Sequence, residues 1–497
     1  MHLRNTLVFP PTDYQNENVS GSPSGTNLEA QLVYQNSTIS KPGQNIIIGT
    51  DSESSSWDDS GPPSTSTASS GLTKCPCETL EDAITENKNG RRKGSLQPEQ
   101  RQQALEFRAC LRCKVLNKIC DKGEPCGGCK PSYARLWQVP YTRMDITDIG
   151  YFMKDWKADY ERHISLGVSD GNIESFSTAY RTLYITHGYG HFISINARKV
   201  FVQDEKCFGI NWVESHENIR AFEVQTAQLS AGKEGVSTTV LSVYLDRHID
   251  SGFEAFVNEY FKGTIFITEI LKIAFRYYQN EKLPSVRKAL KLVLAYNLTF
   301  HVTMVEGLSE EEQFIGKIDD VRSKFNGKTI APFMVNFQIK TAMAQVWRKL
   351  HEDILQDLSL LYSSVLTGDK LEHFPTIFMI TAILLAIWEE MQFDCYYHEL
   401  DENAVNEFCE KMESSPVAVL LGLFQAISSK LPSLQAWDTR QHHHVLSSNA
   451  AACDALSEVR KLVNKHKNYL SGRFSAIFNR DDFDCLSSKL LSQLVIS

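Results

Sequence analysis

At 497 residues, with 42% hydrophobic and 22% charged residues, the chain exceeds what one hydrophobic core usually fills, which excludes a single small domain. Its formal net charge of −9 is unevenly placed, because residues 101–143 hold nine Lys/Arg against three Asp/Glu, a local +6 that leaves −15 elsewhere. A basic segment in an acidic chain predicts a polyanionic partner for that segment alone.

Residues 1–100 are predicted to be a disordered tail. They are rich in Ser, Thr, Asn, Gly and Pro, so they cannot bury enough apolar surface to offset the loss of chain entropy on folding. Trp57-Asp58-Asp59 mixes an aromatic residue with acids, as disordered activation segments do, but for so short a stretch the favoured interpretation is a solvated tail. Arg91-Arg92-Lys93 is a short basic cluster compatible with nuclear import.

Five cysteines follow, within a predicted module of residues 101–145: Cys110, Cys113, Cys120, Cys126 and Cys129. Because residues 1–15 lack the charged-then-apolar order of a secretory signal, these thiols are expected in a reducing compartment, where clusters indicate metal or catalysis rather than disulfides. Zinc accepts four thiolates tetrahedrally, and cysteines separated by two residues can bind one ion without strain. The spacing therefore predicts a zinc-thiolate site.

This module resembles the fungal zinc binuclear cluster (Zn₂Cys₆) family of transcription factors. The resemblance rests on Cys110, Cys113, Cys120-Asp121, Pro125-Cys126 and Cys129, with intervening intervals of two, six, five and two residues. It implies that Cys110 and Cys126 bridge two zinc ions. One ion would be held by Cys110, Cys113, Cys120 and Cys126, and the other by Cys110, Cys126 and Cys129, one ligand short.

Tyr141 stands where a sixth cysteine is expected, since some family members end the final loop in Val-Pro-Cys and this chain reads Val139-Pro140-Tyr141. A neutral phenol, with a pKa near 10, is a poor zinc ligand. The other candidates for the missing ligand are Asp145, Asp148, His163, a water, or the upstream pair Cys75 and Cys77. We therefore expect one zinc, with a second possible.

The residues expected to contact DNA also depart from the family pattern. In well-known relatives a basic pair at the third and fourth positions after the second cysteine reads a CGG triplet, and here Leu116 and Asn117 occupy these positions. Arg112, Lys114 and Lys118 are expected to bind phosphates, and Asn117 to pair with adenine. This predicts retained phosphate contact and an altered or weakened CGG preference.

Two further expectations concern local order in this region. Gly127-Gly128 predicts a poorly ordered start to a second short helix, since each glycine costs about 1 kcal/mol in a helix interior relative to alanine. Apolar residues at helical spacing from Ile149 to Ile164 predict an amphipathic helix within a linker of residues 146–180. That helix would either pair with its twin in a homodimer or dock on the C-terminal domain.

Residues 181–497 are predicted to form one large α-helical domain, which makes the chain mostly α. A hairpin is compatible with residues 183–202, and helices are expected over 253–278, 333–366, 374–391, 417–427, 456–470 and 486–494. Ser414-Ser415-Pro416 predicts a helix start. The apolar run Phe374 to Trp388 is shorter than the ~20 residues that span a bilayer, so a buried core helix is expected rather than a membrane span.

The leading interpretation is a nuclear, zinc-dependent regulator that binds double-stranded DNA and recruits transcription machinery or co-regulators. One alternative is a degenerate member of the family that retains one structural zinc and acts as an interaction protein without specific DNA binding. An enzyme in residues 181–497 is the other, but no nucleophile, base or cofactor motif assembles there.

Overall fold

The computed structural model describes residues 5–8, 108–115, 118–129, 139–152, 173–203, 205–215, 219–368, 371–399, 401–429, 431–434 and 436–496. The chain divides into two compact units, one of them Met1–Thr12 with Leu96–Ser497 and the other Asp13–Ser95. The described residues all belong to the first unit. The predictions for Trp57, for the basic cluster at 91–93, for Leu116 and Asn117 and for most of the helix at 149–164 lie outside the described residues.

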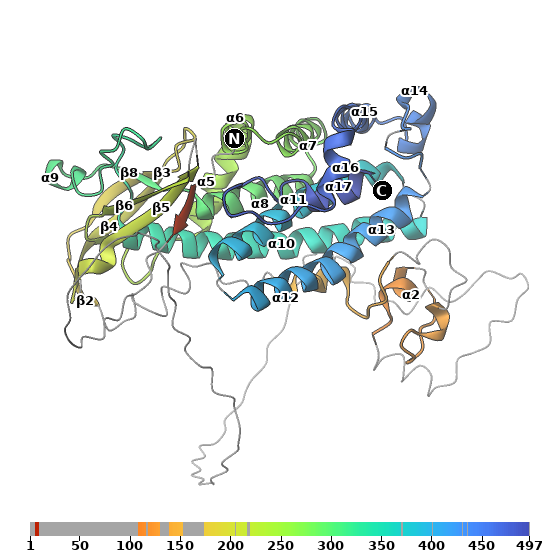
Figure 1. The fold of residues 1–497 in the computed structure, drawn as a ribbon, viewed down its shortest axis with the longest axis horizontal. Helices are drawn as coiled ribbons and strands as arrows, with labels where there is room; N and C mark the ends of the chain where they lie inside the picture. Colours follow the sequence, from red (N-terminus) through yellow and green to blue (C-terminus); the bar gives the residue numbers. More distant parts are fainter. Residues whose placement is uncertain are drawn as a thin grey trace, which may run out of the picture. The chain divides into compact units, whose positions relative to one another are not determined.

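The first unit is mostly helical, as predicted, and three long helices in contact with one another form its centre. Figure 1 shows α10 (Phe333–Gly368) running beside α8 (Pro284–Phe300) and α11 (Phe374–His398), and these three helices contact one another. The other α-helices of the described residues are α2 (Leu111–Val115), α5 (Thr238–Ser251), α6 (Phe253–Tyr260), α7 (Ile267–Glu281), α9 (Glu310–Gln313), α12 (Glu402–Met412), α13 (Ala418–Ser428), α14 (Thr439–His442), α15 (Ala450–Lys465), α16 (Lys467–Arg473) and α17 (Lys489–Ile496).

Helix α11 is the centre of the core, as the length of its apolar run predicts. By length and composition Leu371–His398 is able to cross a membrane, but 83% of its most apolar stretch is buried inside the protein. A helix that is buried to this extent is typical of a protein core. Trp388 and Leu384 on this helix are fully enclosed, and they belong to the same hydrophobic cluster as Leu290 of α8 and Trp347 of α10.

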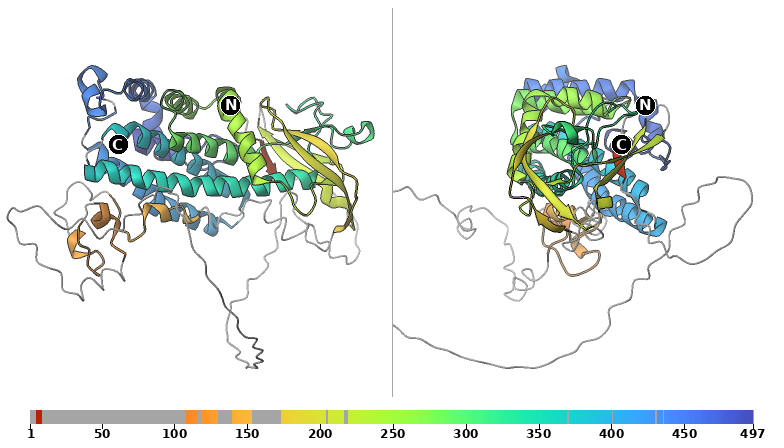
Figure 2. Two further views of the ribbon diagram at one scale, coloured as in Figure 1. Left: turned by 180° about the vertical axis from the view of Figure 1, so that it is seen from behind. Right: turned by 90° about the vertical axis from the view of Figure 1, so that its left-hand side faces the viewer.

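Two antiparallel sheets lie at one end of α10 (Figures 1 and 2). The predicted hairpin is present: β3 (Arg181–Thr186) pairs with β4 (Ile193–Val202) in the register Tyr184↔Ser194. This sheet has the order β2-β4-β3-β8, with β2 at Ile173–Phe176, β8 at Met304–Glu306 and β7 (Leu229–Ser230) paired to β4. The second sheet is β1 (Asn5–Val8), β5 (Gly209–Ser215) and β6 (Ile219–Gln225), which the sequence prediction missed.

Several helix boundaries differ from prediction. The expected helix over 253–278 is divided into α6 and α7 because residues 261–266 are not helical, and the last helix begins at Lys489 rather than at residue 486. Ser414-Ser415-Pro416 does not begin a helix, because α12 continues through a π-helical turn, Glu413–Val417, into α13. Proline has no N–H to donate, and the wider π turn allows the chain to pass it without ending the helix. The expected helix over 456–470 is divided at His466 into α15 and α16, and helix formation begins earlier, at Ala450, where Asn449 caps the first turn.

Candidate metal centre

Helix α2 (Leu111–Val115) positions the first two sulfurs of the cysteine module. Cys110 and Cys113 are three residues apart, so they lie on one face of this turn. The N–H of Lys114 donates to the Cys110 carbonyl at 2.9 Å, and the N–H of Leu111 donates to the Thr142 carbonyl at 2.8 Å. The helix is therefore joined at its start to the returning segment of residues 139–143.

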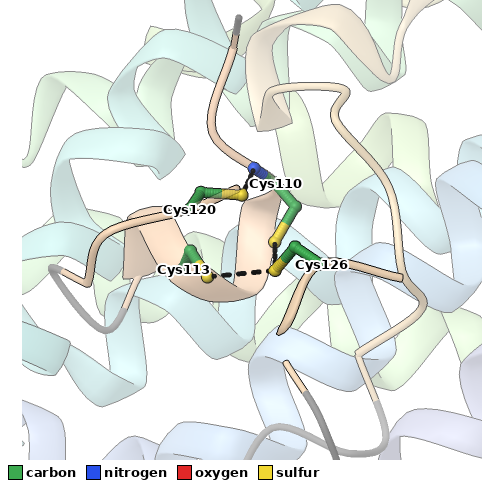
Figure 3. A group of neighbouring side chains, drawn as sticks. All are labelled: Cys110, Cys113, Cys120 and Cys126. Carbon is green, nitrogen blue, oxygen red and sulfur yellow. Dashed lines mark hydrogen bonds between the residues drawn. The ribbon is translucent and has the colours of Figure 1, made fainter. Parts of the chain in front are cut away.

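Cys120 and Cys126 complete a group of four sulfurs (Figure 3). The ligand atoms of Cys110, Cys113, Cys120 and Cys126 all lie within 4.8 Å of one another. The Cys126 sulfur is 3.6 Å from that of Cys110 and 3.5 Å from that of Cys113, and these three side chains are buried.

This geometry fits a tetrahedral metal ion. Bonds of about 2.3 Å from zinc to sulfur place the sulfurs of a regular tetrahedron about 3.8 Å apart, close to the separations observed. The Cys110 N–H donates to the Cys120 sulfur at 3.3 Å, a contact that holds this sulfur beside the start of α2. The four cysteines can therefore bind a metal, and they are the same four that the resemblance assigns to one complete zinc site. The side chain of Cys129 lies outside the described residues.

Asp121 holds the loop between the third and fourth of these cysteines. Its carboxylate accepts from the N–H of Gly123 at 2.9 Å and from that of Gly127 at 2.7 Å. A β-carbon at Gly127 would lie 2.7 Å from this carboxylate, and one at Gly128 would lie 3.2 Å from the Cys113 sulfur. The expected second short helix would continue into residues 130–138, which lie outside the described residues. The two glycines leave room for the chain to pass beside Asp121 and the sulfurs, within a 3₁₀ turn, Gly127–Cys129.

Tyr141 lies against the cysteine cluster, but its hydroxyl is committed elsewhere. It donates to the Gly123 carbonyl at 2.9 Å. Burial raises the pKa of Tyr141, Arg143 opposes that shift, and the nearby thiols Cys110 and Cys126 add to it. The phenol therefore stays protonated at neutral pH, the form that binds zinc poorly.

The other candidate ligands for a second ion also have partners. Asp145 pairs with Lys114 and accepts from the N–H of Ile146 at 2.7 Å. Asp148 pairs with Arg108 at 2.5 Å. His163, Cys75 and Cys77 lie outside the described residues.

Arg143 binds the cysteine loop from the returning segment of residues 139–143, a role that the sequence prediction missed. Its guanidinium donates to the carbonyls of Arg108 at 3.0 Å, Asp121 at 2.9 Å and Gly123 at 3.0 Å, and it lies 3.7 Å from the Cys120 sulfur. A divalent metal ion bound to four thiolates would have a net negative charge. The Arg143 cation beside one of the sulfurs would therefore stabilise the site. The residue lies in a basic segment, but only the fold brings it to the cysteines.

Replacing Arg143 with lysine is expected to lower metal affinity by about 10- to 100-fold, the range seen when groups that orient metal ligands are removed. Lysine keeps the charge but has no planar fork to reach three carbonyls at once. Competition between the protein and a zinc-binding dye measures the affinity, with Arg322→Lys as a control because Arg322 pairs only locally with Asp320. Equal affinities in the two variants would contradict this role.

The residues expected to contact DNA have contacts inside the chain. The Arg112 guanidinium donates to the Val139 carbonyl at 2.6 Å, and Lys114 pairs with Asp145. Lys118 is partly buried, and its backbone N–H donates to the Cys113 carbonyl at 2.9 Å. Asn117 lies outside the described residues. Two of the four side chains therefore hold residues 139–145 against α2 in this structure.

Comparison with known proteins gives two matches. The model of a family described as KpeA transcription factor matches residues 152–494, a stretch that begins after Cys129 and the rest of the cysteine module. The transcription factor kpeA of Aspergillus oryzae (strain ATCC 42149 / RIB 40) is 59% identical over 418 residues, which are 83% of this chain and 55% of that protein. The chain thus spans about half the length of this curated relative. No solved structure matches.

Proposed function

The chain belongs to the KpeA transcription factor family, and on that premise we propose that it is a nuclear regulator whose binding to double-stranded DNA depends on zinc. The single observation that carries the zinc part is the group of four sulfurs at residues 110, 113, 120 and 126. Four thiolates in a tetrahedral arrangement are typical of a closed structural zinc site, which orders the chain around it.

The available ligands fit one zinc ion better than two. The four sulfurs complete one coordination shell, while a second ion would share Cys110 and Cys126 with Cys129 and need a further ligand. Tyr141 is protonated and donates to a carbonyl, so it is poorly suited to that role. The chain thus keeps one half of the binuclear arrangement that the resemblance implies.

DNA contact would come from the basic surface around the cysteines. Arg112, Lys114 and Lys118 would bind phosphates, and Asn117 would supply contact to a base, adenine being the best match for an amide. Phosphate contacts dominate the affinity of so small a module, which is therefore expected to fall steeply with salt. Specificity would require a homodimer on spaced half-sites, and the helical domain would recruit transcription machinery or co-regulators. In this proposal the chain catalyses no reaction.

Selection from a random duplex pool tests the proposal, using the full chain loaded with zinc at moderate salt and a parallel sample with chelator. A defined site that is enriched only with zinc is expected, without a clean CGG half-site. Binding with no enriched sequence, or no binding, would contradict specific DNA recognition. It would favour the alternative that the chain is a regulatory interaction protein with one structural zinc.

A further inference from the structure

The cysteine module is joined to the helical domain by a continuous apolar contact. Leu111, on the helix that carries two metal ligands, is 3% exposed and belongs to the main hydrophobic cluster. Val139, Ile146, Ile149 and Phe152 on the following segment are buried in the same cluster. We call residues 139–152 the docking segment. Within it, a 3₁₀ turn, Ile146–Asp148, contacts α10.

Phe152 inserts into an aromatic group of the helical domain. Its ring meets that of Trp388 edge to face with centroids 5.2 Å apart, and those of Phe408 and His351 at 6.2 and 6.3 Å. Aromatic pairs prefer this geometry over face-to-face stacking. The contact joins α10, α11 and α12, so the docking segment binds a surface that several helices build together.

Gly150 makes the closest approach of the docking segment to α10. A β-carbon on Gly150 would lie 2.5 Å from Cε1 and 2.8 Å from Nδ1 of His351, and 2.9 Å from a methyl of Leu355. His351 is 1% exposed and lies against Phe152 and Trp388, so its ring has little room to move away. Only glycine fits this position in the docked arrangement.

The docking segment also binds basic side chains of the module that would otherwise be available to DNA phosphates. Val139 accepts from the Arg112 guanidinium, Asp145 pairs with Lys114, and Asp148 pairs with Arg108 at 2.5 Å. A side chain held by a carbonyl or carboxylate of the same protein is not available to a phosphate. Asp145 and Asp148 also place negative charge beside these cations. Nearby negative charge repels DNA within a Debye length of about 8 Å.

We propose that this docked arrangement is an autoinhibitory contact: residues 145–152 of the docking segment hold Lys114 and Arg108 against the helical domain, and DNA binding requires their release, while residues 139–143 stay bound to the cysteine loop. The inference rests on the proposed function, because it assumes that α2 meets DNA. The contact is suited to release, since a cleft of about 160 Å³ lies between Thr147, Asp148 and Tyr151 on the segment and Arg348 and Glu352 on α10. An interface that leaves such a gap forgoes part of the dispersion attraction of a close-packed core.

Gly150→Ala in the full, zinc-loaded chain is the sharpest test, because it blocks docking without changing charge. The variant is expected to bind duplex DNA about tenfold more tightly, since more of the population is then competent to bind. Gly472→Ala is the matched control, because a β-carbon there would meet nothing within 4 Å. His351→Ala added to Gly150→Ala makes room for the new methyl and is expected to restore weaker binding.

Asp145→Asn tests the electrostatic half of the contact. Asparagine can still accept from the Ile146 N–H, but it no longer pairs with Lys114. We expect tighter binding to DNA and a salt dependence steeper by about 0.9 in log–log slope for each phosphate contact regained. Asp353→Asn removes the same charge from a surface pair with Lys349 on α10 and is expected to leave both quantities unchanged.

Amide hydrogen exchange of residues 139–152 reports docking independently of DNA. Faster exchange in Gly150→Ala together with tighter DNA binding supports the inference. Faster exchange with unchanged or weaker DNA binding overturns it and leaves the proposed function standing. Unchanged exchange in Gly150→Ala overturns the docked geometry itself. If neither wild type nor variant binds DNA, the proposed function fails, and the inference fails with it.

Discussion

Cys126→Ser is expected to abolish zinc binding by the full chain and to lower its affinity for DNA by more than about 1,000-fold. Cys126 is fully buried, and its sulfur lies within 3.6 Å of those of Cys110 and Cys113, so no other group can take its place. A serine hydroxyl stays protonated at neutral pH and does not replace a thiolate. Structural zinc contributes about 10–16 kcal/mol in small zinc-binding peptides, so the loss of one ligand has a large effect.

Two control variants make this result specific. Cys453→Ser changes a buried cysteine in α15 and is expected to leave the zinc content at one ion per chain. Cys129→Ser is expected to do the same, because the other four sulfurs complete the coordination shell. Zinc content is measured by native mass spectrometry, and circular dichroism checks that the helical domain remains folded. Loss of zinc in Cys129→Ser, or its retention in Cys126→Ser, would contradict the proposed ligand set.

Acidification below about pH 6.5 is expected to destabilise the helical domain steeply. Burial lowers the pKa of His248 and His351 to about 3, and it lowers the pKa of His187 and His301 well below the usual value. Below pH 6.5 the unfolded chain binds protons at these residues and the folded chain does not, so stability falls as pH falls. Each such histidine contributes about 1.4 kcal/mol per pH unit.

One buried carboxyl acts in the opposite direction. Burial raises the pKa of Glu389 to about 8, although its oxygens accept from the N–H groups of Ser488 and Leu491 at the start of α17. The folded chain holds this proton between about pH 4.5 and 8 and the unfolded chain does not, so here stability rises as pH falls. The effect of this carboxyl on the unfolding free energy offsets that of about one histidine. The unfolding free energy therefore still falls on acidification.

Urea unfolding at pH 7.5, 6.5 and 5.5 measures this dependence. A loss of several kcal/mol between pH 6.5 and 5.5 is expected, and His351→Gln should reduce the slope because it removes one titrating ring. An unfolding free energy that stays level over this range would show that the histidines titrate alike in the folded and unfolded states.

The local features of the site could be predicted from the sequence, and the long-range ones could not. A zinc-thiolate site follows from the cysteine spacing because these residues are close along the chain, and the set Cys110, Cys113, Cys120 and Cys126 is the one that the family resemblance implies. The approach of Arg143 to the Cys120 sulfur and of Gly150 to His351 depends on tertiary contacts that no local pattern encodes. The space that Gly127 leaves beside the Asp121 carboxylate depends on such a contact too, since helix propensity says nothing about it.

The fold shows the same division. The 15-residue apolar run of α11 predicts a buried helix because few other structures can bury so many successive apolar side chains. The second sheet was missed because its strands β5 and β6 lie in a region with no strong turn signal between them, and β1 comes from the far end of the chain. The π turn at Pro416 was missed because serine and proline more often mark a helix start than a passage within one.

The most direct test of the account is a zinc titration of the metal-free full chain, in which DNA binding and bound zinc are followed together. We predict that binding to a selected duplex is absent without zinc, rises in proportion to the metal added and saturates at one ion per chain. Binding that is already complete in the metal-free chain, or that requires a second ion, would contradict the claim that one four-thiolate zinc site makes this chain competent to bind DNA.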